Sequence, residues 1–95
     1  MLKVEKQFIL REIAGDYVII PVGKSAQEFK GMITVNNSGA LMWDMLVQGT
    51  TEEALLNMLL ETYEVSEKAA KADIKKFLDE LLKYDIVCKT ESEEI

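Results

Sequence analysis

The sequence predicts an α+β domain, in which an N-terminal, three-stranded antiparallel sheet is followed by three helices. Two observations favour this class. The first third of the chain holds short runs of β-branched and aromatic residues separated by turn-forming residues. The rest holds apolar residues at helical spacing, and each run follows an asparagine, threonine or serine suited to a helix start. The length of 95 residues fits one domain, expected to span 1–95 with its core at about 8–88 and an acidic tail at 89–95.

Two strands joined by a tight turn are expected near the N-terminus. The runs FILREI and YVIIPV are rich in strand-forming residues, and the AGD between them suits a reverse turn. Pro21 has no backbone N–H, so it is expected at a strand end or at an edge. The polar segment from Gly23 to Gly31 is predicted to be a loop. The run MITV, residues 32–35, is predicted to be the third, short strand.

The first helix is expected to begin at Asn36 or Asn37, either of which can cap it, and to end at Gly49. Gly39 falls in its first turn, where glycine lowers helix propensity by ~1 kcal/mol relative to alanine. A close backbone contact at Gly39 is therefore expected, because such a contact would exclude a larger residue.

Two further helices follow. The second is expected to open with Thr50 and Glu53 in capping-box register. Its predicted buried residues are Leu55, Met58 and Leu59. The third is expected to be capped by Ser66 and shows the clearest core-facing stripe. That stripe comprises Ile74, Phe77, Leu78, Leu81 and Leu82. A last short strand is predicted at residues 86–88.

The composition argues against catalysis and against several partners. The chain has no histidine and a single cysteine, Cys88, which is expected to be a small apolar residue on the last strand. We therefore expect no metal and no cofactor. Scattered carboxylates are expected to be solvated: Glu12, Asp16, Asp79 and Glu80. Tyr17 and Trp43 are expected in the core rather than at a site. No apolar run is long enough for a membrane span, and no signal segment is visible, so a cytoplasmic protein without membrane contact is expected.

Nucleic acid is an unfavoured partner. The net charge is −6, whereas proteins that bind phosphate backbones usually carry a basic surface. Lys68, Lys71 and Lys75 do form a basic stripe on the third helix, which a winged-helix DNA-binding regulator would place in the major groove. However, acidic residues share this helix, and it carries no arginine or asparagine to read base edges. A solvated lysine face is the simpler interpretation.

Binding through the third strand is better supported. This strand comes last in the sheet and carries no charge or proline, so an exposed edge could accept a strand from another chain. The third helix could form the opposite wall of a groove, with Phe77 and Leu81 at the junction of core and groove. Its polar rim would contain Asp73, Lys76 and Glu80. Two alternatives remain open: the strand is closed by a loop or dimer partner, or the chain is a structural subunit of an enzyme complex.

The segment ITVNNSGALMWDML resembles the strand–Asn–x–x–Gly–Ala–x–x–Trp segment of PqqD-like proteins. The segment TTEEALLNMLLETYEVSEKAAKADIKKFLDELLKYDIV is similar to the two helices that follow in that family. The resemblance as a whole covers about residues 8–87, which is almost the whole chain. Such proteins are known as RiPP recognition elements, where RiPP denotes a ribosomally synthesised and post-translationally modified peptide.

The resemblance implies a winged-helix-like, non-catalytic domain that binds the leader of a precursor peptide by strand addition. It implies presentation of that precursor to a modifying enzyme, often of the radical S-adenosylmethionine type, and a homodimer is a further possible assembly. The strand positions that the resemblance assigns to peptide binding are Met32, Ile33, Thr34 and Val35. The corresponding helix positions are Asp73, Lys76, Phe77, Glu80, Leu81 and Tyr84.

Overall fold

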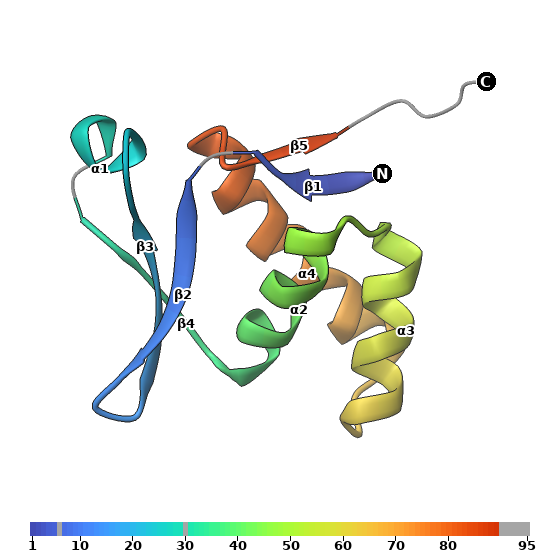
Figure 1. The fold of residues 1–95 in the computed structure, drawn as a ribbon. Coiled ribbons are helices and arrows are strands. Elements are labelled where there is room, and N and C mark those ends of the chain that lie inside the picture. The colour runs from blue at the N-terminus through green and yellow to red at the C-terminus, as the bar shows by residue number, and fades with distance from the viewer. Residues whose placement is uncertain (6, 30, 90–95) are drawn as a thin grey trace.

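The computed structural model describes residues 1–5, 7–29 and 31–89. Figure 1 shows the long strands on one side of the molecule and the three long helices on the other. The elements in chain order are β1 (Leu2–Val4), β2 (Phe8–Ile13), β3 (Asp16–Pro21), α1 (Ser25–Glu28), β4 (Ile33–Val35), α2 (Asn37–Gln48), α3 (Glu52–Thr62), α4 (Glu67–Lys83) and β5 (Val87–Lys89). This is the predicted α+β class, with one short helix and one small sheet added.

The predicted antiparallel sheet has the strand order β2-β3-β4. Ala14 and Gly15 form the turn between β2 and β3, with φ angles of 52° and 87°. Positive φ at both central residues gives the turn a twist that matches the flanking strands of a hairpin. Pro21 is the last residue of β3, as expected for a residue that cannot donate to a ladder. The third strand, β4, pairs with β3 and forms one edge of this sheet.

Side-chain caps begin the three long helices. The Oδ1 atom of Asn36 accepts a hydrogen bond of 2.9 Å from the Gly39 N–H, which resolves the choice between the two asparagines. Gly49 ends α2 at φ 95°, and Ser66 caps α4, so both predictions are confirmed. The capping box predicted at Thr50 is wrong by one residue. The cap of α3 is Thr51, because the backbone of Thr50 is held in hydrogen bonds with Leu2 of 2.6 and 2.8 Å.

The segment from Gly23 to Gly31 is not simply a loop, because it contains the four-residue helix α1. Gln7 holds this helix in place. The Gln7 N–H donates to Ser25 Oγ at 3.1 Å, and the Gln7 side chain accepts from the Lys24 N–H at 3.0 Å. The predicted last strand is confirmed as β5, which begins one residue later than expected and pairs antiparallel with β1. The sequence reasoning did not find β1.

The core lies between the strands and the three long helices. Trp43 is 2 % exposed and occupies its centre, as predicted. The other large, fully buried side chains are Ile19, Met42, Leu46, Leu55, Leu81 and Ile86. Met58, which was predicted to be buried, is only partly buried. Packing against this core fixes α4 beside β4, which creates the site described next.

Candidate functional site

β4 is an edge strand beside a helix. Within the described residues, β3 is its strand partner, and no strand pairs with its other side. Its side chains alternate: Ile33 is buried at 6 % exposure, Thr34 is exposed and Val35 is half-buried. Burial of Ile33 anchors the strand, while the free edge leaves backbone N–H and C=O groups available to another chain. Met32 precedes the strand and is exposed.

α4 supplies the opposite wall. Ile74, Leu78 and Leu81 of its apolar stripe are buried in the core. Phe77 is half-buried at the border of the stripe and packs against the core. The neighbouring flank is exposed and polar: Asp73, Lys76 and Glu80. The helix therefore presents one aromatic side chain and a mixed-charge rim toward β4.

The two walls enclose a groove of about 230 Å³. Six of the ten predicted site residues line it: Thr34, Val35, Asp73, Lys76, Phe77 and Glu80. The sequence reasoning missed the other lining residues, which are Asn36, Ser38, Gly39 and Met42. All four lie in the turn from β4 into α2 or in the first turns of α2, so the Asn–x–x–Gly spacing was the available signal.

Gly39 explains how three elements meet at the floor of this groove. A Cβ atom placed there would lie 3.0 Å from Val35 Cβ and 3.5 Å from Phe77 Cε1. The predicted close contact is therefore confirmed. Without a side chain at Gly39, the start of α2 can approach both β4 and α4.

The other four predicted residues lie elsewhere. Ile33 and Leu81 belong to the core, and Leu81 is 0 % exposed, so it contributes no surface to the groove. Met32 lies outside the lining. Tyr84 packs against Phe29, with ring centroids 5.0 Å apart, and Phe29 in turn contacts Phe8 at 5.4 Å. This aromatic cluster attaches the α1 segment to the end of α4.

The lysine stripe of α4 is largely neutralised by its own helix. Lys71 Nζ lies 2.8 Å from Glu67, and Lys75 Nζ lies 2.9 Å from Asp79. The hydrogen bond between Glu67 and Lys71, and then their charge attraction, lowers the pKa of Glu67 and raises the pKa of Lys71. The paired carboxylates leave no excess positive charge at these two positions, whereas binding to a phosphate backbone depends on such an excess, which disfavours the DNA-binding interpretation.

Neither Cys88 nor any cluster of metal-ligating side chains in the described residues suggests a reactive site. Cys88 lies half-buried on β5, and burial is the main cause that raises the pKa of its thiol, with the Glu5 carboxylate adding to the effect. A raised pKa disfavours the reactive thiolate. Within residues 1–5, 7–29 and 31–89, no group of three metal-ligating side chains is placed to hold an ion. None of the helices in these residues combines the length and the apolar character that a membrane span requires.

Comparison with known proteins yields one matching family and two solved structures of similar fold. The profile of the family described as PqqD, coenzyme PQQ synthesis protein D, matches residues 16–87. No curated protein sequence matches significantly. One similar solved structure is TbiB1 in complex with the TbiA(beta) leader peptide, with TM-score 0.69 and 16 % identity over 98 % of this chain and 99 % of that one.

A second similar structure is lasso peptide synthetase B1 complexed with the leader peptide. Its TM-score is 0.70 at 16 % identity, over 93 % of this chain and 98 % of that one. At this level of identity, the two structures show a shared fold. The family match covers most of the chain, from the start of β3 to the start of β5. The chain belongs to the PqqD family.

Proposed function

We propose that this protein is a non-catalytic peptide-binding domain. It takes up the leader of a ribosomally synthesised precursor as an added strand beside β4 and presents the precursor to a modifying enzyme. One observation carries the proposal: the free edge of β4 runs along a groove whose other wall is α4. Both similar solved structures are described as leader-peptide complexes, which supports the same assignment.

The groove offers two kinds of recognition. The β4 backbone can pair with any extended peptide, which gives affinity with little dependence on sequence. Phe77 and Val35, which are both half-buried, provide apolar surface for a side chain that points inward, since alternate residues of an added strand face the same side. Lys76 and Glu80 form a rim of mixed charge around it. Selectivity would come from these side chains.

Further features of the proposal follow from the family resemblance. The modifying enzyme is of the radical S-adenosylmethionine type, the chain acts in the cytoplasm as one domain spanning residues 1–95, and two copies can associate. Copurification with the enzyme tests the partner. Light scattering of the purified protein, with and without peptide, separates a monomer from a homodimer.

Affinity capture with a paired substitution at Thr34 tests the binding mode. Tagged wild-type protein and the variants Thr34→Pro and Thr34→Ala are exposed to lysate of the source cells, and captured peptides are identified by mass spectrometry. Proline removes a backbone N–H, whereas alanine keeps it and removes the side chain alone. We expect wild type and Thr34→Ala to capture the same precursor, and Thr34→Pro to lose it.

Circular dichroism of both variants controls for folding, because Thr34 is exposed but lies in the centre of β4. Capture of the same peptide by a folded Thr34→Pro variant would contradict strand addition at β4. Capture of large proteins alone, equally by all three forms, would favour a structural subunit instead.

A further inference from the structure

A second hollow continues the groove past the end of β4. Its volume is about 450 Å³, and it shares Val35, Asn36, Ser38 and Asp73 with the groove already described. The shared residues make the two spaces neighbours. A peptide that pairs with β4 and continues beyond Val35 would therefore pass over the second hollow.

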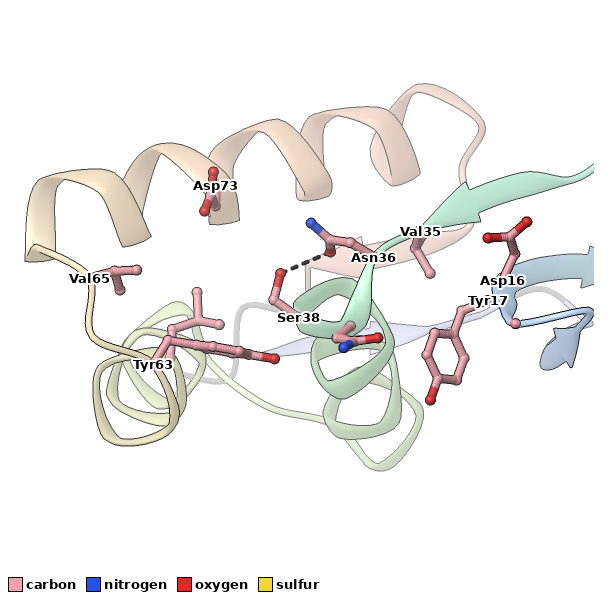
Figure 2. A pocket seen from close by; sticks show the side chains of 11 residues that line it. Asp16, Tyr17, Val35, Asn36, Ser38, Tyr63, Val65 and Asp73 are labelled. Carbon is pink, nitrogen blue, oxygen red and sulfur yellow. Dashed lines mark hydrogen bonds between the residues drawn. The ribbon is translucent and has the colours of Figure 1, made fainter.

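Residues from several separate elements build this hollow (Figure 2). Asp16 and Tyr17 come from the start of β3, and Tyr63 and Val65 come from the link between α3 and α4. In Figure 2 these pairs lie on opposite sides, with the turn from β4 into α2 between them. Asp73 faces the hollow from α4. Tyr17 was expected in the core; it is instead half-buried and lines this surface, so that prediction is wrong.

The lining combines aromatic rings with negative charge. It contains two tyrosines and two carboxylates, and none of the described residues that line it is basic. Neither Asp16 nor Asp73 forms an ion pair within the described part of the chain. The apolar residues Val35, Leu59 and Val65 complete it. The overall charge of −6 adds a long-range attraction for cations.

We propose that this hollow binds an arginine side chain of the leader peptide, at a position just outside the segment that pairs with β4. This proposal rests on the proposed function, because it assigns a second contact to the same peptide. Arginine fits better than lysine. Its planar guanidinium stacks on aromatic rings and hydrogen-bonds to carboxylates, while its aliphatic stem can lie along apolar residues.

The direction of the strands also indicates at which end of the paired leader segment this arginine lies. Both strand pairs of the sheet are antiparallel. A leader that continues this pattern runs opposite to β4, so its N-terminal residues lie beyond Val35. The arginine therefore precedes the paired segment, and the part of the precursor that follows the leader leaves the groove at the Met32 end.

A phage-displayed library of random peptides tests this assignment without knowledge of the natural leader. It is selected against wild type, Asp16→Asn, Asp73→Asn and Glu12→Gln. Glu12 is a matched control, because it is exposed on β2, lies outside the hollow and changes the net charge equally. We expect wild type and Glu12→Gln to enrich arginine before an alternating apolar segment. In each aspartate variant, affinity for such a peptide falls about five-fold, as for an exposed ion pair.

Equal arginine enrichment with the aspartate variants, or none with wild type, would overturn the proposal. Selected peptides that bind a folded Thr34→Pro variant as tightly as wild type would instead contradict the proposed function. A selection that yields no binders would also count against the proposed function. In that case the next measurement decides whether the hollow binds arginine.

That measurement uses a small probe that needs no strand pairing. N-acetyl-arginine methylamide is titrated into the protein, and the ring protons of Tyr17 and Tyr63 are followed by NMR. The citrulline analogue is the control, because it has a similar shape without the charge. We expect saturable shifts with arginine that weaken in Asp16→Asn. Equal shifts with citrulline, or no shift at either ring, would overturn the arginine site, whether or not a peptide is found to pair with β4.

Discussion

The two outer strands of the same sheet are built differently. β2 is six residues long, pairs with β3 along its whole length, and carries the exposed charges of Arg11 and Glu12. β4 has three residues and no charge, and it borders the groove. Charged side chains are a common means of preventing unwanted strand pairing. The strand without this protection, β4, is therefore the one that lies where an added peptide would also contact a helix.

The largest expected effect concerns how each strand is anchored. Ile33 of β4 is 6 % exposed and Ile13 of β2 is 49 % exposed. We expect Ile33→Ala to lower the free energy of unfolding by about 3 kcal/mol, because it removes buried surface and leaves a cavity. The matched Ile13→Ala change should cost less than about 0.5 kcal/mol. Urea denaturation measures both, and equal losses would show that β4 is not held by the core.

Moving a charge from one edge to the other tests which edge binds. Thr34→Lys places a cation on β4, and Arg11→Thr removes one from β2. We expect Thr34→Lys to weaken binding of the captured peptide about five-fold, because the charge disturbs cross-strand packing. Arg11→Thr should leave binding unchanged. Calorimetric titration measures the affinities; tighter binding by Arg11→Thr would indicate β2 instead.

The end of β4 is set by a helix cap, which can be removed alone. Asn36→Ala should destabilise the fold by about 1 kcal/mol, since the Gly39 N–H loses its acceptor. Asn37→Ala is the control, because Asn37 is exposed and already inside α2. Thermal denaturation measures the difference. Equal effects at the two positions would contradict the assignment of the cap.

The smallest effect concerns the flank of α4 away from the groove, where charges are paired. Glu67 has a lowered pKa, so its contribution to stability is present above its unfolded pKa and is lost as pH falls through the folded value. For Lys71, with a raised pKa, the contribution is lost as pH rises through the folded value. We expect NMR titration to show the Glu67 pKa return toward its ordinary value in Lys71→Gln. An unchanged pKa would show that the pair does not form.

Local patterns predicted most of the fold. The hairpin, the third strand and the three long helices follow from residue types close together in the sequence, such as the apolar stripe of α4. The features that were missed depend on distant residues. β1 forms by pairing with β5 at the other end of the chain. The short helix α1 is held by Gln7, more than a dozen residues before it.

The candidate site was predicted only in part, again because some of its contacts join residues that are distant in the sequence. Helix spacing placed Asp73, Lys76 and Phe77 on one flank, and the structure brings them beside β4. Spacing could not show that Leu81 turns fully into the core. Nor could it show that Tyr84, at the end of α4, would pack against Phe29. The second hollow lies between β3 and the link between α3 and α4, an arrangement that no local pattern reveals.

Hydrogen–deuterium exchange of the wild-type protein, with and without the captured peptide, tests strand addition most directly. It compares the two edges in one sample and needs no substitution. We predict slower exchange at the outward-facing amides of β4, residues 33–35, and no change along β2, residues 8–13. Protection of β2, or a bound peptide that protects neither strand, would contradict the account.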